Sequence, residues 1–328
     1  MERRPLGKTG LTVGALGFGC GNVGGLMVRG TPADQQRAVA RALELGINYF
    51  DTAPSYGDGE SERNLGRVLK ALRPDIVLGT KFRIAPGDRG HVTAALKASL
   101  DASLGRLGLE RIDLLQLHNH ISADGGGLNA GTVLDEVVPA LEGLRQQGKI
   151  RFFGITALGD TEALHRVMQA RVLDTAQVCY NLLNPSAGVR LPRNFPAHDF
   201  GQLLDRARET ALGVIGIRIL AAGALSGTEA RHPIAVPAVD PIASGPDYET
   251  DVRRATRLDA LVREGHASSL VEAALRFAIA NDAVSTVLVG YSSLEHLEHA
   301  AACVNKGPLG PAALARLSAL WQDAAAGR

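Results

Sequence analysis

The sequence lacks the features that mark several classes of protein. It has only three cysteines, Cys20, Cys179 and Cys303, an odd number without the spacing of metal ligands. This indicates free thiols in a reducing cytoplasm rather than a disulfide framework. The 35 basic and 34 acidic residues nearly cancel, so the charge balance predicts no nucleic-acid and no membrane-surface partner. No apolar run approaches the ~18 residues that a membrane span needs, and the charged first residues are unlike a signal peptide. We therefore expect a cytoplasmic protein.

The glycine-rich phosphate loop of a doubly wound sheet is also absent. Residues 17–21 are rich in glycine, but their spacing is wrong and no helix follows them directly. The sequence instead alternates short apolar segments with segments of helical period. Strands are predicted at 14–18, 47–51, 76–81, 112–118, 151–155, 175–180, 213–219 and 285–290. Helices are predicted at 34–45, 61–72, 91–106, 133–147, 161–170, 199–211, 268–281 and 293–304.

Eight alternations of strand and helix favour parallel strands joined by right-handed crossovers, closed into one (β/α)₈ TIM barrel over residues 1–328. A small N-terminal β-hairpin is predicted at 6–13. Long loops at 119–131 and 223–248, the second followed by an extra helix near 250–264, are expected at the carboxyl ends of the strands, where barrels place their active sites. Ser61 and Thr161 are interpreted as N-caps of their helices.

Three consecutive predicted strands each deliver an ionisable residue to their carboxyl end. Asp51 ends the second strand, Lys81 the third and His118 the fourth, and Tyr56 lies in the turn just beyond Asp51. One such residue is usually a solvated rim residue. Neighbouring strands of a barrel lie about 5 Å apart, however, so four such groups at one mouth predict a site.

These four side chains form a coherent acid–base arrangement. A buried Lys81 needs a counter-charge, which Asp51 on the adjacent strand can supply. The ammonium group favours the phenolate form of Tyr56, so that this residue can give a proton to a carbonyl oxygen and take it back. His118 can hydrogen-bond the same oxygen. No nucleophile is needed, and a hydride must come from a cofactor.

The stretches 51–57, 79–81 and 115–118 resemble the Asp, Tyr, Lys and His motifs of the aldo-keto reductase superfamily. The similarity extends from the N-terminal hairpin to residues 287–290. It implies an NAD- or NADP-dependent oxidoreductase that interconverts an aldehyde, ketone or aldose with the alcohol or lactone. By resemblance, Tyr56 is the acid and base, Lys81 and Asp51 tune it, and His118 orients the carbonyl. Residues 149–158 are similar to a branch of sugar dehydrogenases that oxidise aldoses, which makes a sugar substrate plausible.

The positions expected to contact the cofactor match the superfamily less uniformly. Gln177 resembles the Gln that binds the carboxamide, whereas Thr156 and Ala157 replace a frequent Ser-Asn pair. Ile217 stands where a Tyr often stacks on the nicotinamide, and the loop 220–227 is suited to cradling a pyrophosphate with backbone N–H groups. The expected cofactor contacts are Gly19, Thr156, Gln177, Ile217, Arg218, Leu220, Gly223, Gly290, Ser292 and Glu298.

The residues after the last strand predict NAD at least as readily as NADP. NADP-using relatives have a Lys or Arg two residues past the strand's final Gly, where this chain has Ser292. No Lys or Arg occurs between Gly290 and Asn305, and Glu298 could instead accept a hydrogen bond from a free ribose hydroxyl. The alternative is that Arg218 or a basic loop residue reaches the 2′-phosphate from elsewhere.

Two other functions are compatible with parts of the pattern. His118 and His120 have the spacing of a metal-binding pair, which suggests a metal-dependent barrel hydrolase, but Asn119 begins a polar loop rather than continuing the strand. We expect no metal. The second alternative is a barrel that binds nicotinamide as a regulatory subunit without catalysis, against which the intact tetrad argues.

Overall fold

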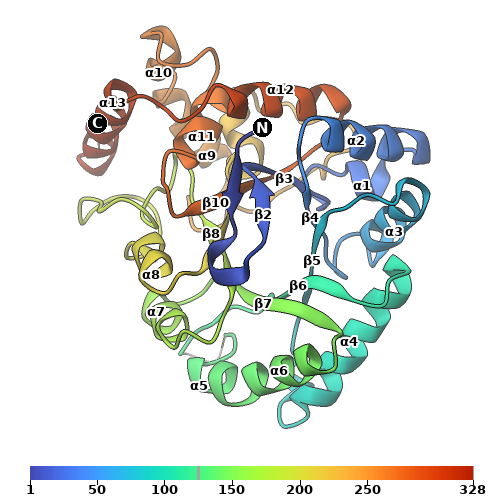
Figure 1. Ribbon diagram of the computed structural model, residues 1–328. Coiled ribbons are helices and arrows are strands. Elements are labelled where there is room, and N and C mark those ends of the chain that lie inside the picture. The colour runs from blue at the N-terminus through green and yellow to red at the C-terminus, as the bar shows by residue number, and fades with distance from the viewer. Residues whose placement is uncertain (124–125, 328) are drawn as a thin grey trace.

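The barrel strands lie where apolar, β-branched segments occur in the sequence. In the computed structural model, which describes residues 1–123 and 126–327, eight parallel strands close into a barrel in the order β10-β3-β4-β5-β6-β7-β8-β9 (Figure 1). The strands are β3 (Leu16–Gly19), β4 (Tyr49–Asp51), β5 (Val77–Phe82), β6 (Ile112–Leu117), β7 (Ile150–Ala157), β8 (Thr175–Cys179), β9 (Gly213–Ile217) and β10 (Val284–Gly290). The predicted (β/α)₈ fold is confirmed.

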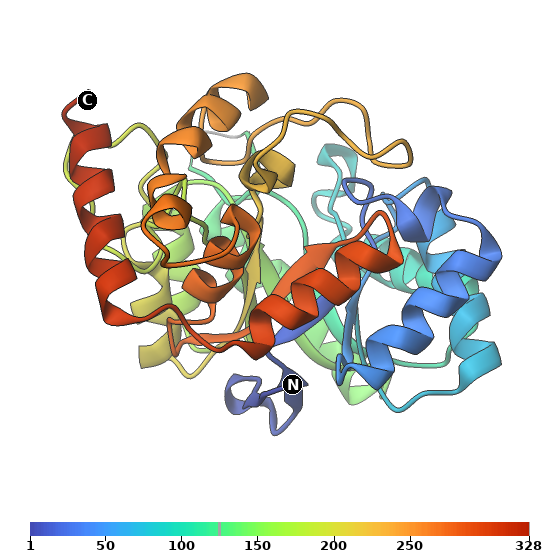
Figure 2. The same ribbon diagram turned by 90° about the horizontal axis from the view of Figure 1, so that it is seen from above.

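The N-terminal hairpin closes the amino end of this barrel. Its strands β1 (Arg3–Pro5) and β2 (Thr12–Gly14) pair antiparallel around the 3₁₀ turn η1 (Gly7–Thr9). The strand predicted at 14–18 begins only at residue 16, because residue 14 pairs within the hairpin. A separate apolar cluster fills the space beneath the hairpin and consists of Leu6, Val13, Tyr49, Val77, Leu114 and Ile215. Figure 2 shows the hairpin at the end opposite the loops that follow β9.

Helices surround the barrel and cover its outer apolar side chains (Figure 1). They are α2 (Pro32–Glu44), α3 (Glu60–Leu72), α4 (Val92–Leu107), α6 (Val138–Gln146), α7 (Thr161–Gln169), α8 (Leu203–Glu209), α11 (Leu270–Ala278) and α12 (Leu294–Asn305). The helix predicted from residue 133 is interrupted, because a short helix α5 (Ala130–Thr132) and a π-helical turn η3 (Val133–Val137) precede α6. The C-terminal helix α13 (Pro311–Ala325) was not among the predicted helices.

The N-cap predictions for two helices are wrong. The N-cap of α3 is Gly59, and Ser61 lies inside the helix, where its hydroxyl donates to the Cys20 carbonyl at 2.8 Å. Ser61 therefore ties α3 to the segment after β3. The N-cap of α7 is Asp160, and Thr161 is its first residue.

The segments at the carboxyl end of the barrel are the longest connections. After β9 come η4 (Ala221–Ser226), a long loop, α9 (Tyr248–Arg257) and α10 (Ala260–Arg263), so the extra helix predicted near 250–264 is two helices. A four-residue helix, α1 (Leu26–Arg29), follows β3. Of the loop predicted at 119–131, residues 124 and 125 lie outside the described residues. In the described parts of the chain, no helix is long and apolar enough to cross a membrane.

Candidate active site

Strands β4 and β5 bring two ionisable side chains into direct contact. Asp51, at the end of β4, lies opposite Gly79 of β5 in the strand register. A Cβ atom at Gly79 would lie 2.8 Å from the Tyr49 hydroxyl and 3.3 Å from Oδ2 of Asp51. The glycine therefore leaves room for a polar cluster inside the barrel. Two residues further along β5, Lys81 reaches the same cluster.

Asp51 and Lys81 form a buried ion pair. Their side chains are 1% and 2% exposed, and Nζ of Lys81 donates to Oδ1 of Asp51 and to the Thr52 carbonyl, the latter at 2.8 Å. Burial opposes the charge of Lys81, but Asp51 and Tyr56 together outweigh it, so that the pKa of Lys81 is raised. Since the pair is buried and well bonded, Lys81 stays an ammonium ion at neutral pH.

Asp51 accepts two further hydrogen bonds, both at Oδ2. The Tyr49 hydroxyl donates at 2.9 Å and Nε2 of Gln177 at 2.6 Å. Burial, and then the Asp51 charge, raise the pKa of Tyr49 well above its ordinary value, so Tyr49 remains a phenol. The sequence analysis assigned no role to Tyr49. Its position two residues before Asp51, on the same face of the strand, is the signal that could have found it.

Tyr56 lies above this ion pair. Nζ of Lys81 is 4.7 Å from the centroid of the Tyr56 ring, and Tyr56 lines a cavity of about 650 Å³ to which Asp51 and His118 also contribute. The structure thus brings together all four residues of the predicted tetrad. The ammonium group of Lys81 thus lies beside the ring of Tyr56, at the cavity that His118 also lines.

His118 follows β6 and is linked back to Asp51 through two neutral side chains. Its Nδ1 lies 2.9 Å from Oγ1 of Thr156, Thr156 donates to Oε1 of Gln177 at 3.0 Å, and Gln177 donates to Asp51. Burial, and then the charges of Lys81, Arg83 and His120, lower the pKa of His118 to about 3. At neutral pH the imidazole is therefore uncharged.

The remaining predicted residues are distributed along the same cavity. Apart from Glu298, every expected cofactor contact lines it: Gly19, Thr156, Gln177, Ile217, Arg218, Leu220, Gly223, Gly290 and Ser292. Glu298 instead forms an ion pair with Arg41 of α2 at 2.7 Å and does not line this cavity. The hydroxyl of Ser292 is buried and donates its only proton to the Gly24 carbonyl at 2.7 Å, so it has no proton left to donate to a ligand.

The backbone after β9 has an unusual conformation. Arg218, Ala221, Ala222 and Gly223 have φ values of 57°, 46°, 58° and 110°. Positive φ values are rare for residues other than glycine, and here they make the chain turn sharply after β9. Ala222, Gly223 and Arg218 all line the cavity. The N–H groups of Ala221 and Gly223 donate to the carbonyls of Arg218 and Leu220, both at 2.8 Å, so the guanidinium group of Arg218 is what this segment offers to an anionic group.

Several residues that the sequence analysis did not single out also line the cavity. They are Arg83, Arg231, His232, His296 and His299. Arg231 holds the long loop in place, because Nε donates to the Val236 carbonyl at 2.7 Å and Nη1 to the Ala222 carbonyl at 2.8 Å. His232 and His296 lie edge to face, with ring centroids 5.7 Å apart. Loop and helix residues of this kind have no periodic signal in the sequence.

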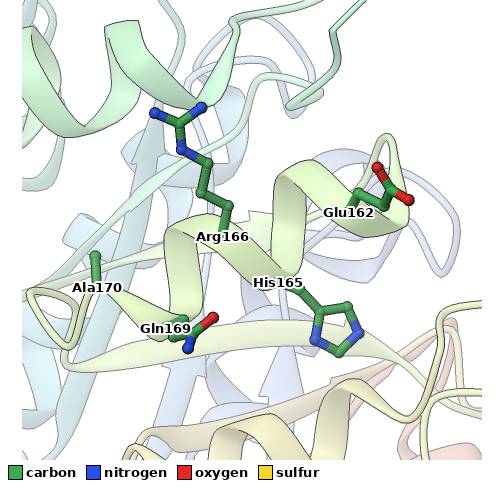
Figure 3. A pocket seen from close by; sticks show the side chains of 5 residues that line it. All are labelled: Glu162, His165, Arg166, Gln169 and Ala170. Atoms are coloured by element: carbon green, nitrogen blue, oxygen red, sulfur yellow. The ribbon is translucent and has the colours of Figure 1, made fainter.

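Another hollow lies on the outside of α7 (Figure 3). It is lined by Glu162, His165, Arg166, Gln169 and Ala170, none of which is a predicted site residue. A ring nitrogen of His165 contacts the Gly201 carbonyl at 3.0 Å. Within the part of the chain that the structure describes, no three His, Cys, Asp or Glu side chains are grouped in a way that could hold a metal ion.

The fold and this site define a barrel oxidoreductase, and comparison with known proteins agrees. The model of the Aldo/keto reductase family matches residues 15–322, and the chain belongs to this family of NAD(P)-dependent reductases and dehydrogenases. It is 32% identical to L-galactose dehydrogenase of Arabidopsis thaliana, over 93% of this chain and 89% of that protein. It is 31% identical to D-threo-aldose 1-dehydrogenase of a Pseudomonas species, over 94% and 95% of the two chains. The holo form of aldo-keto reductase AKR11C1 from Bacillus halodurans superposes with a TM-score of 0.71 at 27% identity, covering 99% of this chain and 96% of that one.

Proposed function

We propose that this protein transfers hydride between a nicotinamide cofactor and the carbonyl carbon of an aldose or small hydroxy-aldehyde, with Tyr56 as general acid and base. The observation that carries the proposal is the buried Asp51–Lys81 pair beneath Tyr56, at the floor of the 650 Å³ cavity. A fixed ammonium ion next to a phenol serves proton transfer to and from a substrate oxygen.

The cavity fits a dinucleotide in its donors and acceptors. Each end of the Gln177 amide makes one hydrogen bond, which leaves one N–H and one lone pair for a carboxamide. Ile217 offers an aliphatic surface for a flat ring, and the guanidinium group of Arg218 suits a pyrophosphate. When bound, the cofactor supplies or accepts the hydride, which no side chain of this site can do.

The protein's own residues move and hold the proton. In reduction, the Tyr56 hydroxyl donates its proton to the carbonyl oxygen as the carbon gains hydride. In oxidation, the phenolate takes that proton from the alcohol. Lys81 keeps its charge in both directions because Asp51 and the Thr52 carbonyl hold it in place. Tyr49 and Gln177 fix the orientation of Asp51 in turn.

A sugar substrate is supported by the names of the relatives. One is an L-galactose dehydrogenase and another a D-threo-aldose 1-dehydrogenase, and both match over most of this chain. The similarity of residues 149–158 to sugar dehydrogenases points the same way. The product of aldose oxidation at the reacting carbon is a lactone.

We further propose that NAD serves at least as well as NADP. No Lys or Arg of α12 lines the cavity, and the helix contributes His296 and His299 instead. Burial, and then His232, lower the pKa of His296, so this imidazole is neutral at pH 7 and gives a 2′-phosphate no fixed positive charge. Glu298, ion-paired with Arg41, does not support the ribose contact that we considered for it.

One set of assays tests both proposals. Aldoses, hydroxy-aldehydes and simple ketones are offered with NADH and NADPH for reduction, and the corresponding alcohols and sugars with NAD and NADP for oxidation. We expect turnover of aldoses or hydroxy-aldehydes, with kcat/KM for NAD equal to or above that for NADP. Tight cofactor binding without hydride transfer to any substrate would contradict catalysis. A preference for NADP of ~10-fold, about 1.4 kcal/mol, would contradict the proposed cofactor use.

A further inference from the structure

A second cavity, the α9–α13 cavity, lies between α9, α13 and the loop that follows β8, and its volume is about 260 Å³. Among the residues that the structure describes, it shares no lining residue with the 650 Å³ cavity that Tyr56 lines. Figure 1 shows α13 at the outer edge of the molecule. Pockets for drug-sized ligands measure about 300–1,000 Å³, so this cavity suits a smaller molecule, one that does not compete with the cofactor.

The buried part of the lining of the α9–α13 cavity is apolar. Trp321 of α13 is 5% exposed, and Nε1 of its indole donates to the Leu182 carbonyl at 3.0 Å. Because that N–H is already bonded, the indole offers the cavity only its apolar ring. Leu182, Leu183 and Leu258 are also buried, and Phe195 belongs to the same lining. The cavity therefore favours a ligand with an aromatic or aliphatic body.

The other part of the lining is positively charged. Arg253, Arg254 and Arg257 of α9 line the cavity, whereas none of the described Asp and Glu residues does. Arg254 is held in the wall, because it pairs with Asp251 at 3.5 Å and donates to the Leu183 carbonyl at 2.8 Å. The charged side chains that line the cavity are therefore all cationic.

Arg253 has donors left for a ligand. Its side chain is exposed, and within the described parts of the chain its only hydrogen bond runs from Nη2 to Oγ1 of Thr250, at 2.7 Å. A guanidinium group has five N–H donors in a planar fork that matches a carboxylate or a phosphate. The charged and apolar parts of the lining adjoin, since Cζ of Arg254 lies 5.7 Å from the centroid of the Phe195 ring. One small molecule can therefore contact both parts.

We propose that the α9–α13 cavity is a second ligand site, which takes a small anion with an apolar body, such as an aromatic phosphate ester or an aromatic carboxylate. The ring packs against Trp321 and the buried leucines, and the anionic group accepts hydrogen bonds from Arg253. An exposed ion pair alone contributes little, so burial of the ring is needed for affinity, and the charge selects anions among apolar molecules. Such a ligand binds whether or not the protein transfers hydride.

Calorimetric titration with phenyl phosphate and with phenylacetate, each with and without saturating NADH, tests this site. We expect one molecule to bind per chain with a Kd of about 1 mM or below for at least one of the two anions, and the same Kd in the presence of NADH. Phenol and inorganic phosphate each carry only one part of phenyl phosphate and should bind at least about tenfold more weakly. A Kd above about 10 mM for both anions, or displacement of the bound anion by NADH, would overturn the proposal.

Two variants, each with a matched control, locate the bound anion. Ala324→Phe adds a ring inside the cavity from a half-buried position of α13, and Ala315→Phe adds one at an exposed position of the same helix. Arg253→Gln removes an exposed charge that lines the cavity, and Arg263→Gln removes an exposed charge of α10 that does not. We expect Ala324→Phe and Arg253→Gln each to raise the Kd by about tenfold or more, and both controls to leave it unchanged. Denaturant unfolding shows that each variant is folded. An unchanged Kd in folded Ala324→Phe or in Arg253→Gln would overturn the proposal.

Discussion

The two ends of the cavity are built in different ways. At the floor, Asp51, Lys81 and Gln177 are strand residues that are almost fully buried and interlocked by direct hydrogen bonds. At the other end, His232 and His296 come from a long loop and from the first turn of a helix, and their rings meet edge to face. The floor holds fixed charges, whereas burial lowers the pKa of His296 and leaves its imidazole neutral at pH 7. Proton transfer requires side chains that are held in a fixed geometry, whereas a surface that only binds a ligand tolerates side chains that can move.

The largest effect is expected at the floor, from Lys81→Met. Loss of the ammonium group leaves Asp51 buried without a counter-charge, which typically costs about 3–5 kcal/mol of stability. Tyr56 also loses the positive charge 4.7 Å from the centre of its ring, so kcat should fall by roughly 10² or more. Denaturant unfolding and steady-state kinetics measure the two effects.

Lys97→Met is a matched control for this change. Lys97 forms an exposed i,i+4 pair with Asp101 on α4, which is worth about 0.3–0.5 kcal/mol. Its loss should leave both measurements nearly unchanged. If Lys81→Met lowers stability and kcat no more than Lys97→Met does, the buried Asp51–Lys81 pair has no special role.

A smaller effect is expected from Arg218→Met, which removes the positive charge beside the left-handed turn. A charge-assisted hydrogen bond to a phosphate contributes about 1.5–3 kcal/mol, so the Kd of NADH should rise by roughly tenfold to a hundredfold, with stability little changed. Fluorescence titration measures the Kd, and Arg208→Met, at an exposed pair with Asp282, is the control. An unchanged Kd would remove Arg218 from the cofactor site.

The third expected effect is a pH dependence of stability caused by His118. Its folded-state pKa is about 3, below the ordinary value of 6.5, so the unfolded chain takes up a proton that the folded protein refuses. Stability from this residue is complete above pH 6.5 and is lost as the pH falls toward 3, by roughly 1 kcal/mol per pH unit. Denaturant unfolding from pH 7 to 4.5 should show a shallower decline in His118→Gln. Parallel curves would contradict a neutral buried imidazole.

The sequence predicts the floor of the cavity better than its other end, for a physical reason. Buried strands have a recognisable pattern, and a barrel brings their carboxyl ends together, so the meeting of Asp51, Lys81 and His118 follows from strand order alone. Contacts between distant surfaces have no such pattern. The pairing of Glu298 with Arg41, across α12 and α2, depends on how the two helices pack.

Local signals also failed where tertiary contacts were stronger. Ser61 has the residue type of an N-cap, but its hydroxyl bonds to the Cys20 carbonyl and to Thr52 because α3 begins one residue earlier. The direction of hydrogen bonds from Asp51 through Thr156 depends on side-chain geometry and could not be read from the sequence.

The central claim, that Tyr56 above the Asp51–Lys81 pair transfers the proton, is tested most directly by Tyr56→Phe. The change removes only the hydroxyl and leaves the ring to pack beside Lys81. We predict that kcat/KM for lactaldehyde or an aldose falls by roughly 10² or more, while the Kd of NADH and the stability stay near their wild-type values. Activity close to that of the wild type in Tyr56→Phe would contradict this account.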